Sequence, residues 1–194
     1  MKHLFLATIV FCMLLSCNTS ASNNDLYQII NTEDKTSFGE LLTIGFDVDD
    51  PDVDGNSPLI IASALGKVNF VEYLINMGAD VNKKNYIGVT ALHMAANGGH
   101  NDVIDMLLDN GAHINMPDMD GITPLMRAVE NGRRFTVELL VHRGALIQFI
   151  NAQGKTALDI AKAKRLKNII IFLEDSIKNP KKKDEGPTYS WDNI

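Results

Sequence analysis

Two histidines and three aspartates have the types and spacing that could support chemistry. His93 and His100 stand seven residues apart in the stretch TALHMAANGGH, and imidazoles bind zinc or transfer protons near neutral pH. Asp50, Asp52 and Asp54 belong to the stretch DPDVDG, which begins like a calcium-binding loop. The first hypothesis to weigh is therefore a calcium- or zinc-binding protein, or a metal-dependent enzyme.

Neither group completes its pattern. A calcium loop needs a bidentate Glu at its twelfth position, where this chain has Ile61. The sequence also has no Gly-rich phosphate loop, no nucleophile elbow and no His-x-x-x-His spacing. We therefore expect no catalysis, no cofactor and no metal. Metal binding through these histidines or aspartates stays as the alternative function.

Composition and charge narrow the class of partner. The 194 residues are 45% hydrophobic, enough for one globular domain, and the net charge is −6. This acidic balance argues against nucleic acid as a partner. Residues 18–126 hold 4 Lys and Arg against 16 Asp and Glu, whereas residues 127–177 hold 9 against 5. This polarity can orient a protein partner, although solvated faces often carry such charge without a role.

The N-terminus has the layout of a secretory signal peptide, residues 1–17. A basic start precedes the apolar run Leu4–Leu15, which is too short to cross a bilayer as a helix. The stretch LLSC ending at Cys17 resembles the lipobox of bacterial lipoproteins, which implies lipidation of Cys17 and a membrane-anchored protein of the cell envelope. The alternative is cleavage near Ala21 and a soluble periplasmic or secreted protein. The small polar residues 18–24 are typical of a flexible tether.

The remaining chain repeats itself every 33 residues. Four sets of positions keep this step: glycines 55, 88, 121 and 154; Ser57 with Thr90, Thr123 and Thr156; leucines 59, 92, 125 and 158; and alanines 62, 95, 128 and 161. A hydroxyl residue followed by proline, as at Thr123-Pro124, is typical of a helix start. Glycines at 66, 99 and 132, and again at 78, 111 and 144, suit helix ends. Each unit is therefore expected to be a helical hairpin with a protruding turn.

The stretches DGITPLMRAVENG (residues 120–132), TALHMAANGGH and GADVN (residues 78–82) resemble the ankyrin repeat family. The resemblance implies an all-α solenoid of helix-turn-helix units with protruding β-turn or hairpin loops, in a domain spanning 25–177. About five repeats, near 22–54, 55–87, 88–120, 121–153 and 154–177, include degenerate terminal caps. The tail 178–194 should lack stable structure because of its prolines and mixed charge.

The repeat positions also give the candidate chemical residues an architectural reading. The position of His93 holds Ile60, Met126 and Asp159 in other copies, so no set of ligands accumulates. In the family the matching histidine bonds locally to the threonine, which here is Thr90. Asp52 shares its position with residues 85, 118 and 151, all Asn or Asp, where such side chains bond their own backbone.

The resemblance implies a monomeric, non-catalytic protein-binding module that contacts its partner with its turn tips and the face of the first helices. The partner is an unidentified protein, and the module serves as scaffold or stabiliser, or as an inhibitor of the immunity type. By position, the predicted contact residues are Val53, Asp54, Asn56, Leu65, Tyr86, Ile87, Val89, Asn97, Met119, Asp120, Ile122, Glu130, Asn131, Ile150, Gln153 and Lys155. The tips are unusually apolar, which favours an interaction site. Alternatively, neighbouring turns pack together and hide these side chains.

Overall fold

The computed structural model describes residues 23–43 and 45–179. The predicted signal peptide with Cys17, most of the predicted tether and nearly all of the predicted tail lie outside these residues. Within the described residues, no helix is both long enough and apolar enough to cross a membrane.

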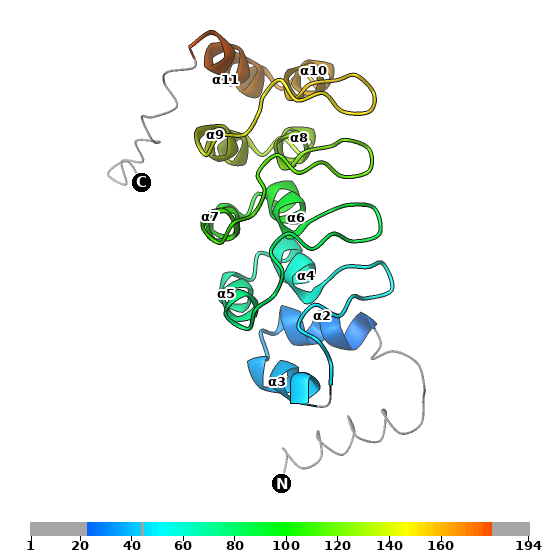
Figure 1. The fold of residues 1–194 in the computed structure, drawn as a ribbon. Helices are drawn as coiled ribbons and strands as arrows, with labels where there is room; N and C mark the ends of the chain where they lie inside the picture. Colours follow the sequence, from blue (N-terminus) through cyan, green and yellow to red (C-terminus); the bar gives the residue numbers. More distant parts are fainter. Residues whose placement is uncertain (1–22, 44, 180–194) are drawn as a thin grey trace, which may run out of the picture.

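The described chain forms ten helices that stack as five pairs (Figure 1). The pairs are α2 (Asn23–Asn31) with α3 (Lys35–Thr43), α4 (Pro58–Ala64) with α5 (Val68–Asn76), α6 (Ala91–Gly98) with α7 (Asn101–Asp109), α8 (Pro124–Glu130) with α9 (Arg134–His142), and α10 (Ala157–Ala163) with α11 (Lys167–Lys178). The predicted all-α solenoid is confirmed. Helix α2 begins at Asn23, so its first two residues fall within the predicted tether, a shift within the usual uncertainty of helix limits.

Helix starts follow the sequence signals. Thr123 accepts a hydrogen bond from the backbone N–H of Met126 (3.3 Å), and Pro124 occupies the first turn of α8. Thr156 is bonded in the same way by the N–H of Asp159, whose carboxylate accepts from the Thr156 N–H in return. These caps satisfy amides that have no partner inside the helix. The short helices can therefore begin at a fixed residue in each unit.

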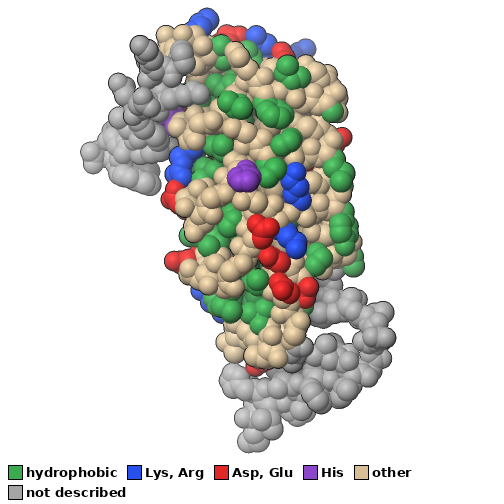
Figure 2. Space-filling model, viewed as in Figure 1, with side chains coloured by type: hydrophobic (Ala, Val, Ile, Leu, Met, Phe, Trp, Pro, Cys, Tyr) green, Lys and Arg blue, Asp and Glu red, His purple; other side chains and the backbone are tan. Residues whose placement is uncertain are grey.

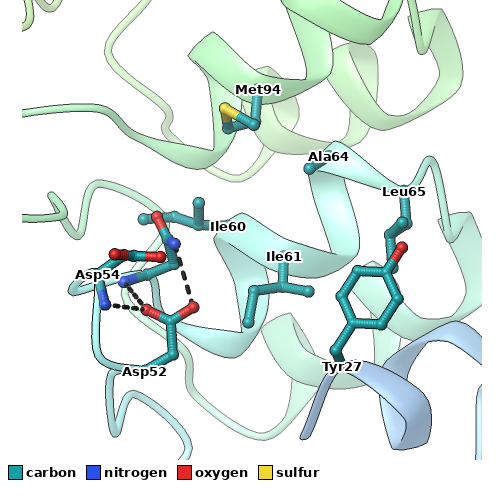
Figure 3. Close-up of a pocket in the computed structure, with 9 residues that line it drawn as sticks. Tyr27, Asp52, Asp54, Ile60, Ile61, Ala64, Leu65 and Met94 are labelled. Carbon is teal, nitrogen blue, oxygen red and sulfur yellow. Dashed lines mark hydrogen bonds between the residues drawn. The ribbon is translucent and has the colours of Figure 1, made fainter. Parts of the chain in front are cut away.

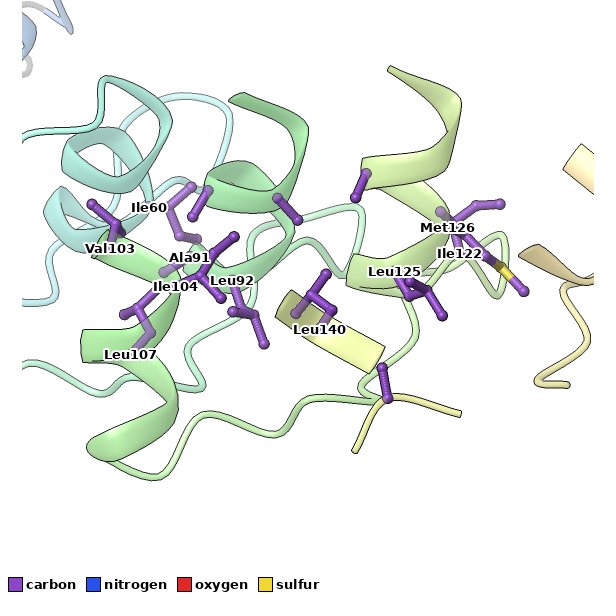
Figure 4. Close-up of a cluster of buried hydrophobic side chains, with 14 of the residues drawn as sticks. Ile60, Ala91, Leu92, Val103, Ile104, Leu107, Ile122, Leu125, Met126 and Leu140 are labelled. Carbon is purple, nitrogen blue, oxygen red and sulfur yellow. The ribbon is translucent and has the colours of Figure 1, made fainter. Parts of the chain in front are cut away.

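The core lies between two layers of helices. Inner helices (α2, α4, α6, α8 and α10) lie on the side from which the turns project, and outer helices (α3, α5, α7, α9 and α11) lie behind them (Figure 1). The repeated apolar positions are buried: Leu59, Leu92 and Leu125; Ala62, Ala95, Ala128 and Ala161; and Leu74, Leu107, Leu140 and Leu173. Figure 4 shows Leu92, Leu107, Leu125 and Leu140 within this core. Alanine at the inner-helix contact lets successive pairs approach closely. We call the inner helices and the turns together the inner face.

Candidate protein-binding surface

The projecting turns are held rigid by one repeated hydrogen-bonding pattern. Asp52 accepts from the backbone N–H groups of Asp54 (2.9 Å) and Asn56 (2.8 Å), two and four residues later. Asn85, Asp118 and Asn151 make the same two bonds within their own turns, at 2.8–3.1 Å. This confirms that Asp52 and its equivalents are turn-forming residues. The four turns therefore present their tips in a fixed conformation.

The second, third and fourth turns are also joined to one another through their backbones. The Met119 N–H donates to the carbonyl of Ile87 (3.1 Å), and the Ala152 N–H donates to that of Asp120 (3.0 Å). A side chain on Gly121 would lie 2.8 Å from the Ala152 nitrogen, and φ at this glycine is +74°. Glycine is therefore required there by both backbone conformation and close approach. The tips form one continuous surface.

The structure divides the predicted tip residues into exposed and buried groups. Tyr86 and Met119 are 65% and 74% exposed, and Val53, Ile87 and Ile150 are also exposed. Val89 and Ile122 are only 5% and 6% exposed. Their prediction as contact residues was wrong, because the fourth residue after the Asx side chain returns toward the inner helices. Asp54, Asp120, Gln153 and Lys155 are exposed, and Asn56 is half-buried.

Hydrophobic side chains recur along the edge of the molecule at which the turns project (Figure 2). On the same view, acidic side chains gather over the lower half, near the first two helix pairs. The arrangement follows the uneven charge of the sequence. The inner face thus combines an apolar edge with an acidic end.

His93 braces two units rather than facing solvent. Its Nδ1 accepts from the backbone N–H of Thr90 (3.2 Å) and lies 2.9 Å from the Thr90 hydroxyl. Because Nδ1 is an acceptor, the proton sits on Nε2, which donates to the carbonyl of Ile122 (3.0 Å). Burial lowers the pKa of His93 to about 4. The predicted local bond to Thr90 is confirmed.

His100 and the aspartates Asp50 and Asp52 take no part in the bond between His93 and Thr90. His100 Nε2 is 3.1 Å from the carbonyl of Ala64. The carboxylate of Asp50 accepts from the N–H of Asp47 (2.7 Å), and that of Asp52 is bonded within its own turn. In residues 23–43 and 45–179, no three His, Cys, Asp or Glu side chains are grouped to hold a metal.

The predicted contact residues of the inner helices differ along the array in the bonds that they make. Asn131, which follows the end of α8, donates to the side chain of Asn97 of α6 (2.8 Å), so these two residues are brought together. Glu130 pairs with Arg127 (3.2 Å), whose guanidinium also bonds Asp118 (2.7 Å). The inner face is polar and internally paired over α6 and α8. Leu65, at the end of α4, instead faces a groove.

This groove, of about 480 Å³, lies mainly between the first two helix pairs and reaches α6 of the third pair (Figure 3). Its walls are Tyr27 of α2, Met94 of α6, and Ile60, Ile61, Ala64 and Leu65 of α4 and its end. Asp52, Asp54 and Asn56 of the neighbouring turn complete it. The sequence analysis did not predict Tyr27, Ile60, Ile61, Ala64 or Met94 as contact residues. The available signal was that the positions of Ile61 and Ala64 hold charged residues two units later, Arg127 and Glu130.

Two parts of the chain match models of a known protein family. Residues 26–118 match a family model described as ankyrin repeats in three copies, and residues 120–152 match a model described as an ankyrin repeat. The chain belongs to the ankyrin repeat family. No curated protein matches it. Ankyrin repeat domains are typically non-catalytic modules that bind other proteins, so the inner face is the surface on which to seek its function.

Proposed function

We propose that this ankyrin repeat chain is a non-catalytic protein-binding module of the bacterial cell envelope that holds its partner on the inner face. One observation carries the proposal. Val53, Tyr86 and Met119 occupy the same turn position in three successive units, and all three are apolar and mostly exposed. A row of exposed apolar side chains on a soluble surface is typical of an interaction site.

The turns give this row the properties of a good contact surface. Each tip is fixed by two Asx hydrogen bonds, and neighbouring tips are joined through backbone bonds at Met119 and Ala152. Little conformational entropy is lost when such pre-organised groups are covered. Tyr86 adds an aromatic side chain, the type most often found at binding hot spots. We propose that Tyr86 and Met119 anchor the partner.

The proposed location rests on the first 17 residues. The lipobox-like stretch ending at Cys17 supports attachment to the membrane by acyl chains, and cleavage near Ala21 is the alternative. Mass spectrometry of the mature N-terminus distinguishes them. An acylated Cys17 as the first residue, lost in Cys17→Ser, supports the anchor. A mature chain that begins after Ala21 refutes the anchor and supports a soluble protein.

The binding test compares two pairs of exposed apolar residues on opposite sides of the array. Tyr86→Ser with Met119→Ser alters the tips, and Phe135→Ser with Ile171→Ser alters comparably exposed residues of the outer helices. Each full chain is used to capture proteins from its native envelope fraction, with identification by mass spectrometry. We expect the tip variant to lose at least about tenfold of the captured partner. Equal capture by both variants contradicts the proposal.

Two versions of the function are separated by the partner's behaviour. As a scaffold or stabiliser, the chain should raise the partner's thermal stability without blocking its activity. As an immunity-type inhibitor, it should abolish that activity in proportion to the bound fraction. An assay of the captured partner with increasing chain decides between them.

A further inference from the structure

We infer that the groove between the first two helix pairs binds a protein segment in which a bulky apolar side chain lies next to Lys or Arg. The inference rests on the proposed function and specifies the chemistry of the partner. It concerns a part of the inner face distinct from the row formed by Val53, Tyr86 and Met119.

The floor and walls of the groove select the apolar side chain. Ile61, Ala64 and Leu65 of α4 line one side, and Tyr27 of α2 stands opposite them (Figure 3). Tyr27 is exposed, and Ala64 and Leu65 are half-buried, so part of this apolar surface meets water. Covering it removes apolar area from water, the main favourable term in association. The groove volume of about 480 Å³ lies in the range of sites that enclose small groups.

The rim of the groove selects the positive charge. Asp52 and Asp54 stand at its mouth, and none of its nine lining residues is Lys or Arg. The Asp52 carboxylate is held in place by the N–H groups of its own turn and by the side-chain amide of Asn56 (3.1 Å). Asp54 is exposed beside it. The acidic excess of residues 18–126 reinforces this field.

The position of the groove favours a protein segment. Val53 lies between the two rim aspartates in sequence, so the groove continues into the row of turn tips. A segment seated in the groove can therefore extend along the surface proposed for the partner. Its apolar side chain would contact Tyr27 and Leu65, and its cation would lie beside Asp54.

The test uses fluorescence polarisation of labelled peptides with the full chain. The peptides differ only in a central block, which is Lys-Leu-Trp-Lys, Glu-Leu-Trp-Glu or Lys-Ser-Ser-Lys. We expect the first to bind at least about tenfold more tightly than the other two, because both the apolar and the basic groups are needed. Equal binding of the three peptides, or no binding, overturns the inference.

Matched variants locate the binding. Ala64→Arg places a long cationic side chain in the groove, and Ala163→Arg places the same side chain at the same position of the last pair. We expect Ala64→Arg to weaken binding of the Lys-Leu-Trp-Lys peptide at least about tenfold and Ala163→Arg to leave it unchanged. Circular dichroism checks that both variants keep their helices. Should Ala64→Arg misfold, Tyr27→Ser gives the same test from the opposite wall, with an expected loss of about fivefold. Wild-type binding by a folded groove variant overturns the inference.

A charge reversal tests the rim. Asp54→Lys should weaken the same peptide about fivefold at low salt, whereas Asp120→Lys, the same change two turns later, should not. Equal effects of the two changes overturn the specific role of the groove.

Two other occupants are distinguished by further variants. The chain's own tail carries Lys181, Lys182 and Lys183 followed by Tyr189 and Trp191. If Tyr189→Ser with Trp191→Ser raises peptide affinity more than about tenfold, the tail competes for the groove and the inference is overturned. Dimerisation that Ala64→Arg abolishes points to a second copy and also overturns it. Unchanged affinity in the tail variant together with a monomeric wild type supports the inference.

The two sets of experiments distinguish failure of the inference about the groove from failure of the proposed function. If the tip variant loses the captured partner while the peptides do not bind, only the inference about the groove fails. If the peptides bind as expected while tip and outer variants capture equally, the proposed role of the turn tips fails and the groove remains.

Discussion

The joint between the first and second helix pairs and the joint between the third and fourth are built on the same positions, 66 residues apart. We call the first joint open because its side chains line a groove, and the second closed because His93 bonds across it. At the open joint these positions hold Tyr27, Asp52, Asn56, Ile61 and Ala64, and they line a groove. At the closed joint they hold His93, Asp118, Ile122, Arg127 and Glu130.

Each substitution along the frame contributes to closure. His93 reaches the Ile122 carbonyl across the joint (3.0 Å), and the Ile122 side chain is buried. Arg127 extends from α8 to the carboxylate of Asp118 (2.7 Å) and to that of Glu130 (3.2 Å). Ile61 and Ala64 cannot make such bonds. One backbone frame can therefore supply either a rigid connection or a binding site, depending on side chains that the repeat motif leaves variable.

Replacing the buried side chain of Ile122 should lower the free energy of unfolding more than any other change at the closed joint. Ile122→Asp places a carboxylate where the side chain is 6% exposed, and we expect the free energy of unfolding to fall by about 4 kcal/mol or more. Asn56→Ala, at the matching position of the open joint, should cost about 1 kcal/mol. Urea denaturation followed by circular dichroism measures both. Equal losses would show that the two joints do not differ as described.

Acid should weaken the closed joint through His93. The pKa of His93 is about 4 in the folded chain because of burial, against 6.5 in the unfolded chain. The unfolded state therefore binds the proton first, so this contribution to stability is complete above pH 6.5 and falls as the pH drops toward 4. The full loss is roughly 3 kcal/mol.

Denaturation at several pH values, compared with His93→Met, measures that loss. Methionine holds the same position in the next pair, at Met126. The variant should lose less stability than the wild type between pH 6.5 and 4. If the unfolding free energies of the two proteins fall by the same amount between pH 6.5 and 4, His93 is not neutral and buried in the folded chain.

Removal of Arg127 should have an intermediate effect. The Asp118 side chain is 2% exposed, so Arg127→Ile leaves a buried carboxylate without its ion-pair partner. We expect a loss of about 2 kcal/mol, since Arg127 is itself partly exposed and two backbone N–H groups still bond Asp118.

A second change tests that explanation. Asp118→Asn in the same chain should recover most of the loss, because asparagine holds the equivalent turns at Asn85 and Asn151. A double-mutant cycle measured by urea denaturation gives the coupling. No recovery in the double variant would mean that the buried charge is not the cause.

Closing the open joint should have the smallest effect on stability. Ile61→Arg with Ala64→Glu copies Arg127 and Glu130 into the second pair, opposite Asp52. We expect the unfolding free energy to fall by about 1.5 kcal/mol, because Ile61 is 8% exposed and part of its apolar burial is lost. The Lys-Leu-Trp-Lys peptide loses its site. Thermal unfolding and fluorescence polarisation measure the two effects. If this folded variant binds the peptide as tightly as the wild type, the peptide-binding site does not lie in the groove.

Much of the fold follows from the sequence because each repeated position has a local cause. Thr123 caps its helix, and Asp52 and Asp118 fold their turns through bonds to nearby backbone. Such causes act within a few residues, so the 33-residue step reveals them. His93 could likewise be assigned to the architecture, since it bonds Thr90 three residues away.

The site could be predicted less fully because it depends on contacts between units. Val89 and Ile122 are as apolar as Tyr86 and Met119, and only the path of the Asx turn shows that the first two point inward. The groove exists because Ile61 and Ala64 do not fill a space that Arg127 and Glu130 fill elsewhere. A space left by short side chains has no sequence motif of its own.

Hydrogen–deuterium exchange of the full chain, alone and with its captured partner, tests the central claim most directly. We expect slower exchange at the turn tips 53–56, 86–89 and 119–122, with the outer helices α5, α7 and α9 unchanged. Protection confined to those outer helices, with unaltered exchange at the turns, would contradict binding on the inner face.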